Sequence, residues 1–229
     1  MPAIYLIRHG QASFEAEDYD QLSTMGERQS QLLGASLKQR RLKPAHAFSG
    51  TMRRHQQTAS HCLSAMDASL SLQTLPALNE YDHRAIIAAH TPRYADTTVM
   101  RAEMAQQAEP WRAFQKFYSA AVERWMNPDY ASDYQEPWNQ FRQRCLDGLQ
   151  QVVDASDASE NVLVFTSGGP IMAVCQHLLG LSPAQSLQMN WLLLNSGVTQ
   201  LQRKANGYRL SSFNEHAHIE ADSELLTYR

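Results

Sequence analysis

The sequence predicts an α/β protein, a three-layer α/β/α sandwich built on a mainly parallel sheet. Short apolar runs of strand type alternate along the chain with longer helical patterns, and this order places helices on both faces of a parallel sheet. A mostly helical stretch at about residues 84–137 interrupts the alternation and is expected to form a cap insertion. With 229 residues the chain is long enough to hold this as one domain, residues 1–229, that includes the cap.

The expected strands are short runs rich in apolar residues. Ala3–Ile7 and Asn161–Phe165 are the most apolar, as is typical of strands buried on both faces. Further strands are expected at His46–Gly50 and Ser71–Leu75, and a terminal pair at 197–203 and 208–213 joined by a turn at residues 205–207.

Three long helices are expected between these strands, at about residues 26–41, 52–66 and 138–155. Ser23 or Thr24 can cap the first one, and Glu27 stands three residues after Thr24, the spacing of a capping box. Within the cap, aromatic and apolar residues recur at helical spacing and are expected to face the core: Trp111, Phe114, Tyr118, Val122 and Trp125. Residues 127–137 are expected to form a loop.

The composition excludes several classes of protein. A net charge of −3 argues against a nucleic-acid partner, and no apolar run reaches the roughly 18 residues that a membrane span needs. The first residues lack the basic and apolar regions of a signal peptide. The three cysteines are odd in number and far apart, so we expect buried, reduced thiols in a cytoplasmic protein: Cys62, Cys145 and Cys175.

Three polar stretches stand where predicted strands end. They read "RHG" at residues 8–10, "SGTMRR" at 49–54 and "TSGG" at 166–169. The carboxyl ends of parallel strands meet at one edge of the sheet, where such folds bind their ligands. We therefore expect these stretches to converge on a single site.

The chemistry of these residues suits a phosphoryl group. A histidine such as His9 can attack phosphorus when its imidazole is neutral. Arg8 and Arg54 would lower its pKa and bind the phosphoryl oxygens as bidentate donors. Gly10 would let the backbone approach the phosphate closely.

Five stretches in this order resemble the motifs of the histidine phosphatase superfamily, also called phosphoglycerate mutase-like. The resemblance covers almost the whole chain except the cap. The stretches are "LIRHGQ", "LSTMGERQ" (Leu22–Gln29), "FSGTMRRHQQTA" (Phe48–Ala59), "LNE" (Leu78–Glu80) and "VLVFTSGGPI" (Val162–Ile171).

The resemblance implies a role for each matching residue. His9 matches the nucleophile that becomes phosphohistidine, and Glu80 matches the proton donor to the leaving group. Asp82 and His83, just beyond Glu80, are rival donors. The register of Gln57, Thr58 and Ala59 makes Arg54, rather than Arg53, the second phosphate-binding arginine beside Arg8. Gln11 stands where members carry glutamate or glutamine, and the family chemistry needs no metal or other cofactor.

The sequence departs from the family pattern at Ser167, where members carry a second histidine. Serine keeps a hydrogen-bond donor but supplies no positive charge, so we expect a working site with a rate lowered about ten- to a hundred-fold. The rest of this stretch suits an anion. Gly168 and Gly169 leave the backbone accessible at the start of a helix, and Thr166 offers a further donor.

We therefore expect a metal-independent phosphoric-monoester hydrolase whose partner is a small phosphorylated metabolite. A mutase is the second reading, because the region after Glu80 lacks the basic, tryptophan-containing tract of that branch. A non-catalytic module that binds a phosphorylated ligand is the third. Ser167 motivates it, and the retained Glu80 speaks against it. The oligomeric state stays open, with a homodimer as one option.

The other histidines are expected to have no part in the chemistry. His216 and His218 form an "HAH" stretch without an acidic or cysteine partner, so a structural role is favoured over a metal site. The remaining ones are expected to be surface or packing residues: His46, His55, His61, His90 and His177.

Overall fold

The computed structural model describes residues 2–13, 20–204 and 207–228. Within them, six strands form one sheet in the order β3-β2-β4-β1-β5-β6. The first four strands along the chain pair in parallel, and β5 pairs antiparallel with both β1 and β6, which confirms the mainly parallel sheet. The strands are β1 (Ala3–Arg8), β2 (Pro44–Ser49), β3 (Leu72–Thr74), β4 (Asn161–Thr166), β5 (Val198–Lys204) and β6 (Gly207–Glu215).

The two central strands, β1 and β4, set the geometry of the site. Nearly every residue in them is buried, because helices cover both faces of the sheet at its centre. They pair in parallel with Arg8 opposite Thr166. Consequently the residues that follow, His9 and Ser167, leave the sheet side by side at its carboxyl edge.

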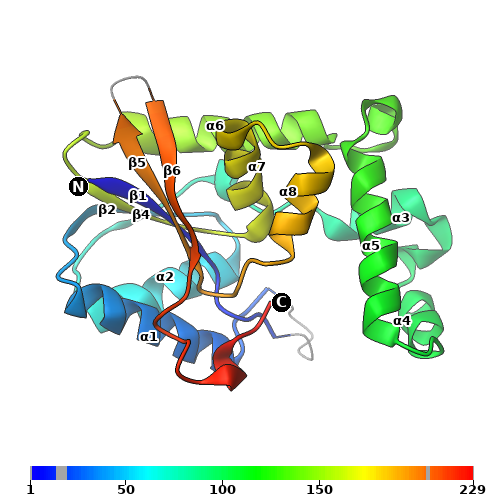
Figure 1. The fold of residues 1–229 in the computed structure, drawn as a ribbon, viewed down its shortest axis with the longest axis horizontal. Coiled ribbons are helices and arrows are strands. Elements are labelled where there is room, and N and C mark those ends of the chain that lie inside the picture. The colour runs from blue at the N-terminus through cyan, green and yellow to red at the C-terminus, as the bar shows by residue number, and fades with distance from the viewer. Residues whose placement is uncertain (1, 14–19, 205–206, 229) are drawn as a thin grey trace.

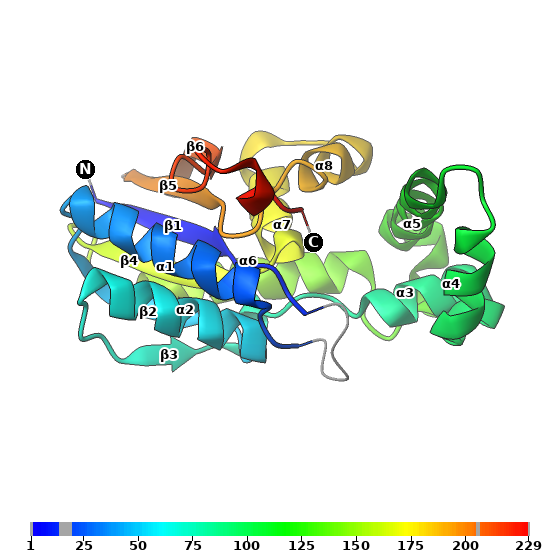
Figure 2. The same cartoon turned by 90° about the horizontal axis from the view of Figure 1, so that it is seen from below.

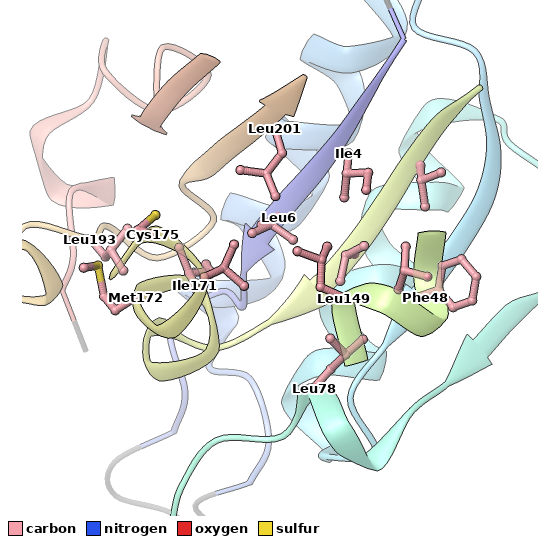
Figure 3. Close-up of a cluster of buried hydrophobic side chains, with 14 residues drawn as sticks. Ile4, Leu6, Phe48, Leu78, Leu149, Ile171, Met172, Cys175, Leu193 and Leu201 are labelled. Atoms are coloured by element: carbon pink, nitrogen blue, oxygen red, sulfur yellow. The ribbon is translucent and has the colours of Figure 1, made fainter. Parts of the chain in front are cut away.

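Helices cover the two faces of the sheet in pairs. α1 (Thr24–Gln39) and α2 (Arg53–Met66) lie below the sheet in Figure 1, and α6 (Trp138–Asp154) and α7 (Gly168–Leu179) lie above it. Alternate residues of the central strands therefore enter two different cores. Ile4 and Leu6 join the cluster under α6 and α7 (Figure 3), whereas Ala3, Tyr5 and Ile7 pack against α1 and α2.

The segment expected to form a cap holds three helices that gather beyond the carboxyl edge of the sheet (Figure 2). They are α3 (His83–His90), α4 (Thr97–Ala105) and α5 (Pro110–Met126). On α5 the predicted apolar face is only partly buried: Val122 and Trp125 pack against α6, while Trp111 stays exposed. The helices thus stand next to the end of the sheet where β1 and β4 release the site residues.

The structure differs from the sequence prediction in a few elements. α8 (Pro183–Asn190) was not predicted; a capping box between Ser182 and Gln185 stabilises its start. Part of the expected loop at 127–137 forms a short 3₁₀ helix, Pro128–Asp133. α1 begins two residues earlier than predicted, with Ser23 as its cap. The turn predicted at 205–207 lies partly outside the described residues. None of the described helices is both long and apolar enough to cross a bilayer.

Candidate active site

His9 leaves the end of β1 with its ring held in one orientation. Its backbone N–H donates to the carbonyl of Thr166 at 2.9 Å, which continues the β1–β4 ladder by one residue. Its Nδ1 lies 2.7 Å from the Gly10 carbonyl oxygen. A carbonyl only accepts hydrogen bonds, so Nδ1 carries the proton and Nε2 keeps its lone pair. This is the tautomer that a nucleophilic histidine needs.

The surroundings of His9 keep its imidazole neutral. The side chain is only 6% exposed. Burial is the largest cause that holds the pKa of His9 well below its usual value, and the nearby Arg54, His55 and Arg8 lower it further. The hydrogen bond to the Gly10 carbonyl opposes this but does not reverse it. Arg8 and Arg54 thus lower the pKa of His9 as predicted, and burial lowers it more than they do.

The two arginines reach the site from different elements. Arg54, near the start of α2, is buried and donates from Nη1 to Asp20 Oδ1 at 2.7 Å. Asp20 also accepts from the backbone N–H of Arg53, whose side chain is exposed. Arg8 donates to the carbonyl of Leu193, and to that of Tyr228 at 2.9 Å. Carboxylate and carbonyl oxygens thus orient both guanidinium groups.

Glu80 places its carboxyl group at the N-terminus of α7. Oε2 accepts from the Gly169 backbone N–H at 3.1 Å, and Oε1 accepts from that of Tyr81 at 3.2 Å. Burial raises the pKa of Glu80 and outweighs the lowering by these N–H groups and by Arg54 and Arg8. The raised pKa extends the pH range in which this carboxyl group holds a proton.

The two rival proton donors lie in less suitable places. Asp82 is exposed and caps α3, where its Oδ1 accepts from the backbone N–H groups of Arg84 and Ala85 at 2.9 and 3.1 Å. His83 is only partly buried, and burial lowers its pKa, which disfavours the protonated form that a donor needs. These placements favour Glu80.

Ser167 has a hydrogen-bond partner that the sequence does not predict. It stands at the N-cap of α7, yet its side chain does not cap the helix. Its Oγ instead lies 2.6 Å from Nε2 of His55, a fully buried residue of α2 next to Arg54. Gly168 follows as the first residue of α7. The Thr166 hydroxyl, considered as an anion donor, instead donates to the Leu78 carbonyl at 2.6 Å.

Gly10 and Gln11 connect the site to α1. A Cβ on Gly10 would lie 2.4 Å from the carbonyl oxygen of Gly26, so the close approach of α1 by itself requires glycine here. The Gly10 N–H donates to Thr58 Oγ1 at 3.0 Å. Gln11 Oε1 accepts from Ser23 Oγ at 2.8 Å, at the start of α1. Both residues therefore stabilise the packing around His9.

Other polar groups singled out in the sequence have partners or surroundings of their own. His218 Nε2 lies 2.8 Å from Ser196 Oγ, a structural contact near the C-terminus. In the described part of the chain, no group of three or more His, Cys, Asp or Glu residues is arranged to hold a metal ion. The three cysteines are buried and free, and burial raises the pKa of Cys62 and of Cys175 to about 12.

Taken together, the fold and the site define an α/β protein with a cluster of buried polar and charged groups at the carboxyl edge of its sheet. The cluster brings a neutral histidine near two arginines, and the same arginines act on a buried carboxyl group. The sequence profile of the histidine phosphatase superfamily (branch 1) matches residues 4–216, and the chain belongs to this family. The family confirms the resemblance and supports phosphoryl transfer, by a phosphatase or a mutase, as the class of activity.

Solved structures of the same fold cover nearly the whole chain. A phosphoglycerate mutase from Bacillus anthracis str. Sterne is 19% identical with a TM-score of 0.65, and the alignment covers 95% of each chain. A mutant phosphoserine phosphatase from Entamoeba histolytica, in complex with phosphoserine, is 14% identical with a TM-score of 0.66, over 96% of this chain and 100% of the other.

A mycobacterial glucosyl-3-phosphoglycerate phosphatase is 19% identical with a TM-score of 0.64, over 93% of this chain and 98% of the other. At these identities the similarity concerns the fold. A search of curated protein sequences finds no significant match.

Proposed function

We propose that the protein is a metal-independent phosphoric-monoester hydrolase that acts on a small phosphorylated metabolite through a phosphohistidine at His9. The observation that carries the proposal is the state of His9. Its imidazole is neutral, and the 2.7 Å contact to the Gly10 carbonyl leaves Nε2 with a lone pair. A buried imidazole fixed in this way and flanked by two arginines is prepared for attack on an electrophile that bears negative charge.

The reaction follows from these positions in two steps. Nε2 of His9 attacks the phosphorus in line, and the bond from phosphorus to the ester oxygen breaks. Glu80 gives its proton to the leaving alcohol, while Arg8 and Arg54 neutralise charge on the phosphoryl oxygens. Glu80, now a carboxylate, then takes a proton from water. The resulting hydroxide attacks the phosphorus, the bond from phosphorus to Nε2 breaks, and phosphate leaves His9 in its original neutral state.

Gly10, Gln11 and Gly168 have supporting roles in this proposal. Gly10 and Gln11 fix the loop between β1 and α1, and the start of α7 at Gly168 offers its helix dipole to the bound anion. The Entamoeba and mycobacterial phosphatases suggest phosphoserine and glucosyl-3-phosphoglycerate as first substrates to test.

A mutase is the second candidate, supported by the fold similarity to a phosphoglycerate mutase. A mutase must hold the dephosphorylated product until the phosphoryl group returns. The segment just after Glu80 offers only Arg84 and Arg93 as fixed cations, and Arg93 is bound to Glu103 at 2.7 Å. This segment gives little support for retention of a charged product, so hydrolysis is favoured.

The test is hydrolysis of an activated aryl phosphate by the wild type and by His9→Ala, with a chelator present, between about pH 5 and 8. We expect turnover by the wild type and none by the variant. Mass spectrometry of the acid-labile phosphoprotein should locate the phosphoryl group on His9. Equal turnover by both proteins would contradict the mechanism. Transfer to added phosphoglycerate in place of water would favour the mutase.

A further inference from the structure

We propose that His55 acts through Ser167 as a positioning residue, so that the Ser167 hydroxyl donates a hydrogen bond to an oxygen of the phosphoryl group held at His9. The inference rests on the proposed function, because it assigns a role within the same phosphoryl-transfer step. It gives the site a second imidazole, which comes from α2 and reaches the phosphoryl group through a serine.

Residues that follow β1 and β4 lie close to a residue of α2. Ser167 follows β4 and His9 follows β1, and these strands are paired up to Arg8 and Thr166. Nε2 of His55 lies 2.6 Å from Ser167 Oγ, and the ring centroids of His55 and His9 are 5.7 Å apart. The Ser167 hydroxyl is thus bonded to a buried imidazole whose ring is a close neighbour of the nucleophile's ring.

The protons of the pair can be assigned from their partners. His55 is neutral, because burial and Arg54 hold its pKa well below the usual value, so its ring carries one N–H. Its Nδ1 is buried and has no hydrogen-bond partner among the described residues. A proton on Nδ1 would be a buried donor with no acceptor, which is costly. The proton therefore belongs on Nε2, which donates to Ser167 Oγ.

This assignment directs the hydroxyl proton of Ser167 away from His55. Its Oγ accepts from His55, and the same side chain makes no capping bond to α7 although it occupies the N-cap position, where serine usually accepts from a backbone N–H. A hydroxyl that already accepts from an imidazole N–H is a better donor, since hydrogen bonds in a chain polarise one another. An oxygen of a phosphoryl group would accept the hydrogen bond from this hydroxyl.

Space for the imidazole depends on one glycine. A Cβ on Gly50 would lie 2.3 Å from His55 Nδ1, so any other residue there would displace the ring. Gly50 thus leaves the room that the buried His55 ring needs at its Nδ1 side. If the position required only volume, an apolar side chain would fill it without the cost of burying polar groups.

The test separates hydrogen bonding from packing with a matched pair of variants. Gln and Met have similar volume, but the Gln amide can donate from about the position of His Nε2, whereas Met has no donor. We would measure kcat/KM for an aryl phosphate, the affinity for inorganic phosphate by calorimetry, and thermal unfolding. The variants are His55→Gln, His55→Met, Ser167→Ala and the double variant His55→Met with Ser167→Ala.

We expect His55→Met and Ser167→Ala each to lower kcat/KM by about tenfold, the usual cost of losing a hydrogen bond to a charged group. The double variant should be no worse than either single one, because the residues act as a unit. His55→Gln should retain most of the activity. His61→Met, which removes a partly exposed histidine from the same helix, is the control and should match the wild type.

Equal activity of His55→Gln and His55→Met would overturn the proposal, as would losses that multiply in the double variant. Phosphate affinity makes the result independent of turnover. If the wild type shows no turnover that depends on His9, the proposed function fails. About tenfold weaker phosphate binding by His55→Met and Ser167→Ala, but not by His55→Gln, would then still support the pair, and unchanged binding would refute it.

Discussion

Replacement of Gly169 by alanine tests the place of Glu80 more sharply than removal of the carboxyl group. A Cβ at this position would lie 2.0 Å from Glu80 Oε1, and 2.7 and 2.8 Å from two atoms of the Tyr81 ring. Ordinary contact begins at 3.4 Å, so the carboxyl group must move by about 1.4 Å. The 3.1 Å hydrogen bond from the Gly169 N–H to Glu80 Oε2 is then disrupted.

The size of the effect depends on the leaving group. General acid catalysis contributes about 10² to 10⁴ in rate, and a misplacement of about 1 Å can cost about 10². An alkyl phosphate needs a proton on its departing oxygen, so Gly169→Ala should lower its kcat/KM by about a hundredfold. An activated aryl phosphate leaves without that proton, and its kcat/KM should fall less than about threefold.

The measurement is the ratio of kcat/KM for an alkyl and an aryl phosphate. This parameter reports the steps up to phosphohistidine formation, so slow hydrolysis of the intermediate does not enter. Glu80→Gln should shift the ratio in the same direction. Gly148→Ala is the matched control, because its Cβ would lie 2.9 Å from Ala77 Cβ, a clash with a hydrocarbon group. An unchanged ratio in a folded Gly169→Ala protein would refute Glu80 as the donor.

Three further predictions concern stability, the pocket and its arginine. Because His9 and His55 have lowered pKa values in the folded protein, the unfolded chain binds more protons below about pH 6.5. The free energy of unfolding should therefore fall with falling pH by about 1.4 kcal/mol per pH unit for each histidine. Urea titrations of His55→Met at several pH values should show that the slope of this free energy against pH is lower by the contribution of one proton. Gly50→Ala should displace the His55 ring and lower kcat/KM for an aryl phosphate about as His55→Met does; a wild-type value would show that the ring tolerates the methyl group. Arg54→Lys should lower kcat/KM about ten- to a hundredfold by loss of the planar fork, whereas Arg53→Lys should have little effect, and equal effects would contradict the assigned register.

The sequence was sufficient to predict the sheet and most of its helices. β1 and β4 are nearly all apolar because both of their faces are covered, and this pattern is local in the sequence. The residues that follow them, His9 and Ser167, could be assigned to one edge because parallel strands end together. α8 was missed because it is short and buries only Ser186 and Leu187, too few positions for a helical period to stand out.

The contacts within the site were harder to predict, because they join residues that no local pattern connects. His55 and Ser167 are 112 positions apart, and the hydrogen bond between them depends on how α2 packs beside the start of α7. Read alone, the serine suggested a weakened site. Asp20, which binds Arg54, was overlooked for the same reason. Two signals in the sequence pointed to the contact between His55 and Ser167. They are a histidine directly after a site arginine and a glycine at position 50.

The hydrogen bonds of Arg8 determine when, during synthesis of the chain, the site can be completed. Its guanidinium group donates to the carbonyls of Leu193 and Tyr228. Gln29 holds the segment at residues 225–228 as well, because its amide donates to the Leu225 carbonyl at 2.8 Å. On the ribosome, Arg8 is made 220 residues before Tyr228. A nascent chain that already has its sheet and helices would thus still lack a correctly held arginine, so phosphate binding should appear only after residues 225–228 leave the exit tunnel.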